Sequence, residues 1–424
     1  MSPERRDLWR DILILFLAAL ALRLGLALSL PAHQLVGDES YWYYARNLAD
    51  GQGFQMSNPY GAGLDIPKVY AFRPPLFPFL WGIARPVIGN AYWPIRCTFA
   101  LLGALTCVLA YLAAREMFRR RSVSLLGGLL CAFYPPLVWH SVNLMTEPLF
   151  IFFSTLCIFA LFRARSALSW RWAVAAGLAA GLGILTRSVL VGFLPFMALW
   201  LWWCAGRRRR AVALAAAFCT TALLVMLPWV IRNAIVLKAF VPTTTDVGHG
   251  SYVANNEHSL GDPRGFWIPD DWSFVKKSPE EQPGEVEVSR RLTRMAREFL
   301  WTHPGTAARL MARRFVALWR FYPHGEFVAN EETPRRTVMI YALSYIPLFP
   351  FMLLGLWLAR KRAGEALPDV ALVYLVIFLT TAVHVAVLAM VRYREPLMPF
   401  LLPFAALGLV ETFQFLRERL RRSA

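Results

Sequence analysis

Long apolar runs recur along the whole sequence and restrict the fold more than any other feature. A helix needs about 20 apolar residues to cross the hydrocarbon core of a bilayer, where every backbone polar group must be satisfied within the segment. The sequence therefore predicts an all-α integral membrane protein with about ten transmembrane helices. The predicted spans lie near residues 11–30, 93–115, 122–140, 144–163, 172–186, 188–205, 211–231, 337–359, 368–391 and 396–416.

The charged residues indicate which side of the membrane each loop occupies. Lys and Arg outnumber Asp and Glu by 45 to 27, but they form no surface stripe of the kind that binds nucleic acid. They form short clusters between the apolar runs, as in the cytoplasmic loops of membrane proteins. We therefore expect a multi-pass protein of the cell (plasma or inner) membrane, in contact with membrane lipids and with no nucleic-acid partner. The clusters lie at residues 5–10, 119–121, 163–171, 207–210, 360–362 and 417–422.

This topology divides the chain into three parts. We expect residues 1–231 to form an N-terminal transmembrane module whose first outer loop, 31–92, carries catalytic residues. Residues 232–336 form a long outer loop, and residues 337–424 form the C-terminal transmembrane helices with a basic cytoplasmic tail. The apolar stretch 74–88 is interrupted by prolines, and we predict an interfacial or re-entrant hairpin there.

The second half of the long outer loop has the pattern of amphipathic helices lying on the membrane surface. Apolar residues recur at helical spacing between residues 286 and 322, with arginines off the stripe. The predicted stripe is Leu310, Met311, Phe315, Leu318, Trp319 and Tyr322, and the arginines off it are Arg309, Arg313, Arg314 and Arg320.

Three acidic residues on the predicted outer side are candidates for acid–base chemistry. Asp38 and Glu39 open a helix just after the first span, and Glu147 opens the fourth span. The structural interpretation is that they are helix caps and first-turn acids, which favour helix N-termini. The functional interpretation is that a carboxylate near the low-dielectric interface acts as a general base.

Four arginines also lie on the outer side, against the trend of the other basic residues. Arg73 precedes two prolines that fix the backbone, Arg187 stands between two spans, and Arg392 and Arg394 follow the ninth span. Anchoring at the interface explains such residues structurally. The alternative is phosphate binding, for which the planar guanidinium fork is well suited.

Other kinds of site find little support in the sequence. The seven histidines form no HExxH pattern, and no Walker loop or GxGxxG appears, so ATP-driven transport is not supported. The six cysteines lie within or at the ends of apolar runs, which predicts neither a disulfide framework nor a zinc site. We expect that the protein requires no cofactor or metal. The sequence leaves open the alternative of a divalent cation held by carboxylates.

Taken in order along the chain, these motifs resemble the polytopic GT-C glycosyltransferases. More narrowly, the motifs resemble the family that includes protein O-mannosyltransferases and the aminoarabinose and galacturonic acid transferases of lipopolysaccharide. The segments that carry it are Gly37-Asp38-Glu39, Leu48-Ala49-Asp50-Gly51-Gln52-Gly53, Arg73-Pro74-Pro75-Leu76, Thr146-Glu147-Pro148, Leu185-Thr186-Arg187, Leu227-Pro228-Trp229-Val230-Ile231-Arg232-Asn233, the stretch 248–256 ending in Asn255-Asn256, and Arg392-Tyr393-Arg394-Glu395-Pro396.

The resemblance implies a GT-C-like helix bundle and an inverting transfer of a monosaccharide from a polyprenyl-phosphate donor to an acceptor hydroxyl at the outer face. Asp38 matches the family's base. Glu39 and Glu147 would orient the acceptor, and the acceptor is a lipid, a glycan or a protein. The expected phosphate ligands are Arg73, Arg392, Arg394 and Arg187, and the expected donor or acceptor contacts are Tyr41 and Asn256.

Two other functions remain open at this point. A lipid-linked sugar flippase or exporter would also have many spans and arginines lining a cavity, but it has no chemical need for Asp38 and Glu39 at the anomeric carbon. A non-catalytic scaffold of an envelope-polymer machine would tolerate Asp38→Ala. One fold can host different functions, so the site has to distinguish them.

Overall fold

The computed structural model describes residues 3–423 except 34, 36, 61–62, 65, 207–208, 262–268, 270, 279, 324–333 and 363. In this part of the chain the regular structure is helical, with two isolated backbone bridges, Gly37 to Leu144 and Met56 to Val69. The helices of the bundle are α1 (Pro3–Ser29), α4 (Trp93–Phe118), α5 (Arg121–Phe133), α7 (Glu147–Ala167), α8 (Trp170–Thr186), α9 (Leu194–Cys204), α10 (Arg209–Leu237), α14 (Arg335–Tyr345), α15 (Phe349–Arg362), α16 (Leu367–Ala386) and α17 (Met398–Ser423).

The apolar runs form helices long enough to cross a membrane, as predicted. Seven of the described helical segments have the length and composition of a membrane span, and α5, α8 and the segment Ser188–Cys204 are apolar but shorter. The predicted span 122–140 is divided between α5 and the short helix α6 (Pro135–His140), because Pro135 lacks the N–H that would continue the helix. The exact number of crossings stays a prediction.

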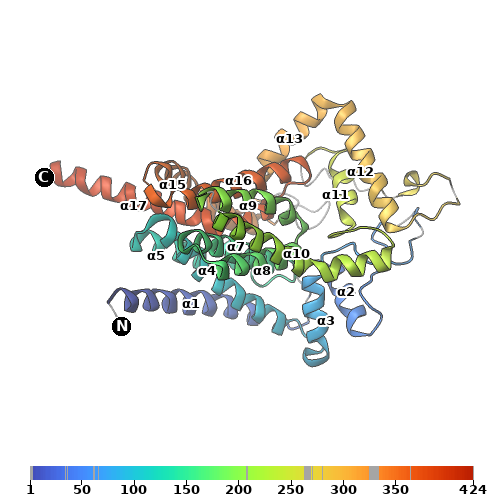
Figure 1. Cartoon of the computed structure of the whole chain (residues 1–424), viewed down its shortest axis with the longest axis horizontal. Coiled ribbons are helices and arrows are strands. Elements are labelled where there is room, and N and C mark those ends of the chain that lie inside the picture. Colours follow the sequence, from blue (N-terminus) through green and yellow to red (C-terminus); the bar gives the residue numbers. More distant parts are fainter. Residues whose placement is uncertain are drawn as a thin grey trace.

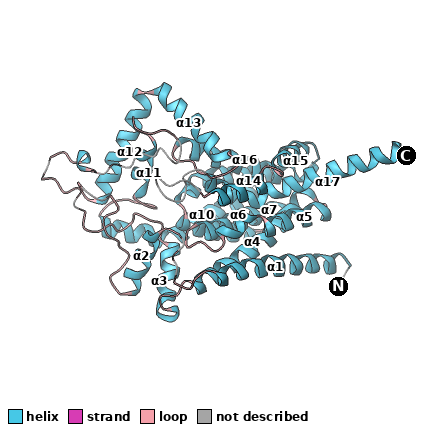
Figure 2. Ribbon diagram, turned by 180° about the vertical axis from the view of Figure 1, so that it is seen from behind, coloured by secondary structure: helices cyan, strands magenta, loops and turns pink. Residues whose placement is uncertain are grey.

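The two ends of the bundle differ in their chemistry. Both chain termini lie at one end, and the remaining helices gather at the other (Figure 1, Figure 2). At the terminal end, loop arginines pair with acids, for example Arg121 with Asp11 at 2.8 Å and Arg165 with Asp369 at 2.8 Å. The helices at the opposite end are α2 (Glu39–Ala49), α3 (Leu76–Ile88), α11 (Asp246–Ala254), α12 (Glu285–Thr302) and α13 (Pro304–Trp319).

The stretch predicted as a hairpin is a single helix. In both views α3 runs across the direction of α1 at the end of the bundle (Figure 1, Figure 2). Its buried side packs on neighbouring aromatic residues, with the rings of Phe77 and Trp81 5.4 Å apart and Trp81 5.7 Å from Tyr92. A single helix replaces the predicted hairpin, and its place at the membrane interface stays a prediction.

The amphipathic pattern of α13 is wrong at one position. Arg314, predicted on the polar face, is fully buried. The Arg314 guanidinium donates to the carbonyl oxygens of Val385 and Ala386 at the end of α16, and to Asn255 Oδ1 at 2.9 Å. Helix C-termini leave carbonyl groups without intrahelical donors, and a buried guanidinium satisfies several of them at once.

Candidate active site

A cavity of about 240 Å³ opens among the helices at the end away from the termini. Three carboxylates and three arginines line it, which is unusual inside a protein unless the charges are paired. The lining residues are Asp38, Tyr41, Arg73, Pro74, Met145, Thr146, Glu147, Thr186, Arg187, Ser188, Val189, Asp246, His384, Arg392 and Tyr393.

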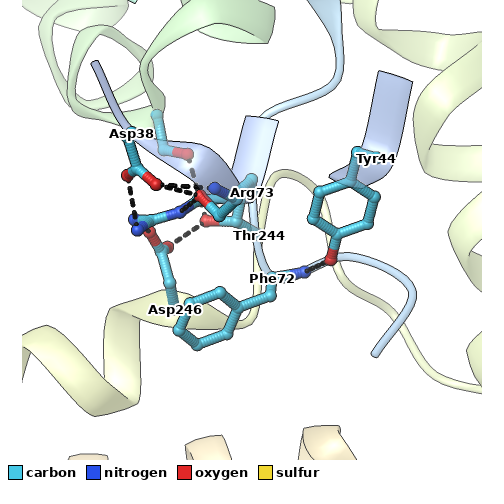
Figure 3. A network of polar contacts seen from close by, with 8 residues as sticks. Asp38, Tyr44, Phe72, Arg73, Thr244 and Asp246 are labelled. Atoms are coloured by element: carbon cyan, nitrogen blue, oxygen red, sulfur yellow. Dashed lines mark hydrogen bonds and ion pairs between the residues drawn. The ribbon is translucent and has the colours of Figure 1, made fainter. Parts of the chain in front are cut away.

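One half of the cavity is built around Arg73 (Figure 3). Asp38 Oδ2 accepts a hydrogen bond from Arg73 Nη2 at 2.8 Å, and Arg73 Nε donates to Ser40 Oγ at 2.9 Å. The guanidinium lies 5.6 Å from the centre of the Tyr41 ring. Asp38 Oδ1 accepts from the backbone N–H of Ser40 at 2.9 Å, so this residue both caps α2 and holds Arg73.

A close backbone contact brings Asp38 to the bundle. Gly37 forms a parallel bridge with Leu144, three residues before Glu147. Gly37 has φ +151°, and a Cβ at this position would lie 2.3 Å from the Leu144 carbonyl oxygen. Only glycine fits here, and the contact sets the first outer loop beside the start of α7.

The backbone just before Arg73 is held by two charged side chains. Glu285, at the start of α12, accepts from the backbone N–H of Tyr70 at 3.0 Å, and burial raises the pKa of its carboxyl. From the other side, Arg232 Nη1 donates to the Tyr70 carbonyl at 2.7 Å. Helices α10 and α12 thus fix the loop that presents Arg73.

We expect Glu285→Gln to lower the free energy of unfolding by about 1–3 kcal/mol, because its amide nitrogen cannot accept the Tyr70 and Ala71 N–H groups. Thermal melting of the purified variant in detergent measures the effect. Glu298→Gln, an exposed change on the same helix, is the control and should leave the melting temperature unchanged. Equal melting of the two variants would contradict the role of Glu285.

The other half of the cavity is built around Glu147. This side chain is buried, and Arg187 Nη1 donates to its Oε1 at 2.8 Å, while Arg392 Nε lies 3.9 Å away. The Arg187 guanidinium lies 4.8 Å from the centre of the Tyr393 ring, and that ring stacks on His384 at 4.6 Å. Two of the predicted phosphate ligands therefore share one carboxylate.

The structure adds one carboxylate that the sequence analysis missed. Asp246, at the start of α11, has its Oδ2 3.7 Å from Arg73 Nη1, and Thr244 Oγ1 donates to its Oδ1 at 2.5 Å. Burial raises the pKa of Asp246. The acid in Thr244-Thr245-Asp246 looked like an ordinary helix start, and nothing local distinguishes it from one.

Three predicted site residues lie outside the cavity lining. Glu39 is exposed on the first turn of α2. Arg394 is fully buried, donates to the carbonyl oxygens of Leu318 and Arg320, and so caps the end of α13. Asn256 Nδ2 donates to the Tyr252 carbonyl at 2.8 Å and closes α11. The structure places none of the three where it would contact a ligand in this cavity.

Within the described ranges, no group of three or more His, Cys, Asp or Glu side chains is arranged to hold a metal ion. The carboxylates of the cavity face arginines, with Arg73 lying between Asp38 and Asp246.

The whole fold is shared with a membrane glycosyltransferase of known structure. The chain superposes on the archaeal oligosaccharyltransferase AglB from Archaeoglobus fulgidus, in complex with an inhibitory peptide and a dolichol-phosphate, with a TM-score of 0.59 at 14% identity. The match covers 100% of this chain and 52% of that one, so the chain spans about half its length. The protein has the fold of the GT-C membrane glycosyltransferases, which confirms the fold expected from the sequence.

Part of the chain is also similar in sequence to known transferases. Residues 72–231 match the family model for dolichyl-phosphate-mannose-protein mannosyltransferase. An undecaprenyl phosphate-alpha-4-amino-4-deoxy-L-arabinose arabinosyl transferase of Pseudomonas aeruginosa is 34% identical over 157 residues, which is 35% of this chain and 28% of that protein. A second such transferase, of Pseudomonas fluorescens, is 30% identical over 159 residues, again 35% of this chain and 28% of that protein. The range matched by the family model includes Arg73, Glu147 and Arg187.

Proposed function

We propose that this chain is an inverting glycosyltransferase that moves a monosaccharide from a polyprenyl-phosphate donor to an acceptor hydroxyl of a lipid, glycan or protein. The observation that carries the proposal is that three carboxylates and three arginines line one cavity together. The fold of known glycosyltransferases supports it, as do the relatives that use undecaprenyl-phosphate sugars.

The charges of the cavity match the charges of the reaction. The acceptor oxygen attacks the anomeric carbon, the bond from that carbon to the phosphate oxygen breaks, and the electron pair leaves with the polyprenyl phosphate. The leaving phosphate gains negative charge, which Arg187 and Arg392 are placed to stabilise. The hydroxyl proton passes to a carboxylate of the cavity, a role that the resemblance assigns to Asp38.

The position of the cavity supports an outward-facing reaction in the cell membrane. Asp38 and Asp246 line it from the starts of α2 and α11, and these helices lie at the end of the bundle opposite the chain termini (Figure 1). Basic loops favour the cytoplasmic side. Nucleotide sugars are cytoplasmic, so an enzyme on the outer side needs a donor that has already crossed the membrane, such as a lipid-linked sugar.

We expect Asp38→Asn to lower kcat/KM for sugar transfer about 100-fold or more. The change removes a carboxylate that either accepts the proton of the acceptor hydroxyl or holds Arg73 in position. The asparagine oxygen can still accept the Ser40 N–H, so α2 keeps its cap. The assay measures transfer in nanodiscs from a panel of radiolabelled polyprenyl-phosphate sugars to membrane extract.

Asp50→Asn is the matched control for this experiment. Asp50 ends the same helix, but it pairs with Arg85 at 2.7 Å and does not line the cavity. We expect this variant to transfer sugar at the wild-type rate. If wild-type protein binds donors but transfers from none of them to any acceptor fraction, the transferase proposal is wrong and the flippase is favoured.

A further inference from the structure

The cavity holds two carboxylates on opposite sides of Arg73, and they are not equivalent (Figure 3). Asp38 is engaged through both oxygens: Oδ1 accepts from the backbone and hydroxyl of Ser40, and Oδ2 accepts from Arg73 at 2.8 Å. Asp246 Oδ1 accepts from Thr244 Oγ1, and its Oδ2 is 3.7 Å from Arg73 Nη1, beyond hydrogen-bond distance.

The backbone around Asp246 is built to hold the side chain in place. The N–H of Thr245 donates to the Ala71 carbonyl at 2.8 Å, and this bond joins the start of α11 to the loop that presents Arg73. The hydroxyl of Thr244 lies 3.3 Å from Ser188 Oγ, next to Arg187. Asp246 therefore stands between the two halves of the cavity, on a rigid element.

We propose that Asp246 accepts the proton of the attacking hydroxyl, and that Asp38 instead holds Arg73 in position. This inference rests on the proposed function and names a second carboxylate in its site. As the new bond from the acceptor oxygen to the anomeric carbon forms, the O–H proton moves to Asp246 Oδ2. The bond to the phosphate breaks, and its electron pair leaves with polyprenyl phosphate.

The surroundings of Asp246 suit this role. Burial raises the pKa of its carboxyl, and a base is more effective when its pKa approaches the operating pH. The cations that oppose this effect are Arg73 and Arg187. The other charged or titratable groups nearby are Asp38, on the far side of Arg73, and His249, one turn further along α11, whose pKa burial lowers to about 4.

The test compares the steady-state kinetics of Asp246→Asn and Asp38→Asn with the donor that wild-type protein uses. We expect Asp246→Asn to lower kcat about 100-fold or more while Kd for undecaprenyl phosphate changes less than about threefold. We expect Asp38→Asn to raise the KM for donor at least as strongly as it lowers kcat, since it releases Arg73. In wild type we expect kcat to fall at acidic pH. We expect this acidic limb of the pH profile to be absent in Asp246→Asn.

The opposite pattern would overturn the inference. If Asp38→Asn loses kcat with donor binding intact and Asp246→Asn retains wild-type kcat, Asp38 is the base. A wild-type protein with no transfer from any donor would instead overturn the proposed function. Thermal melting of both variants, measured beside the kinetics, distinguishes lost catalysis from lost folding.

A second variant covers the case in which Asp246→Asn does not fold. Thr244→Val keeps the side-chain shape but removes the hydroxyl that lowers the pKa of Asp246. We expect the acidic limb of kcat to move to higher pH in Thr244→Val. An unchanged limb in this variant would contradict the assignment of Asp246.

Discussion

Arg187→Gln is expected to bind undecaprenyl phosphate about 10- to 100-fold more weakly than wild type, and to melt at a lower temperature. Arg187 donates to Glu147, whose side chain is only 1% exposed. Without Arg187, the nearest remaining cation to the Glu147 carboxylate is Arg392, 3.9 Å away, and breaking a buried ion pair costs about 3–5 kcal/mol. Equilibrium binding of radiolabelled undecaprenyl phosphate in detergent and thermal melting measure the two effects.

A double variant separates the two roles of Arg187. In Arg187→Gln with Glu147→Gln no charge of the pair is left unpaired, so we expect most of the lost melting temperature to return. Phosphate binding should stay weak, because the cation is still absent. If the double variant recovers binding as well, Arg187 only stabilises the fold. Arg163→Gln, which breaks a half-exposed pair with Glu116 at the other end of the bundle, should have little effect on either measurement.

The second large effect is expected for Gly37→Ala. The added Cβ would meet the Leu144 carbonyl oxygen at 2.3 Å, so the chain around Asp38 must move. Displacement of catalytic groups by about 1 Å can lower a rate about 100-fold. We therefore expect transfer to fall by about that factor, with undecaprenyl phosphate binding reduced less, because Arg187 and Arg392 lie on other elements.

A matched glycine provides the control for this change. Gly25 lies in α1, and a Cβ there would have no heavy atom within 4 Å. Gly25→Ala should leave transfer unchanged and stabilise the helix slightly, by about 0.5–1 kcal/mol. Wild-type transfer in Gly37→Ala would show that the bridge to Leu144 does not position Asp38.

Local sequence patterns predicted part of the site. Asp38 follows a span and opens a helix, Arg73 precedes two prolines, and Glu147 opens another span. Each of these patterns has a local physical cause, a cap or a fixed backbone, and all three residues line the cavity. Asp246 has the same local pattern as many helix starts, and only its approach to Arg73 distinguishes it.

Two predicted site residues lie outside the cavity lining, and Arg314 lies off its predicted face, for one shared reason. Arg394 and Arg392 are two residues apart on one 3-10 segment, η5 (Val391–Leu397), so one faces the cavity and the other points to the end of α13. Asn256 and Arg314 likewise satisfy backbone groups at helix ends. A sequence shows that a polar residue is near the membrane interface, but it does not show which carbonyl groups the folded chain leaves without donors.

The sequence alone determined the helical membrane fold and the separation of basic loops from the acidic and arginine-containing motifs. These properties follow from the length of the apolar runs and from where charge interrupts them, both of which are local. Only the tertiary structure decided which arginines face which carboxylates. The contacts between Gly37 and Leu144, Tyr70 and Glu285, and Arg73 and Asp246 join segments far apart in the chain, so their partners exist only after the helices have packed.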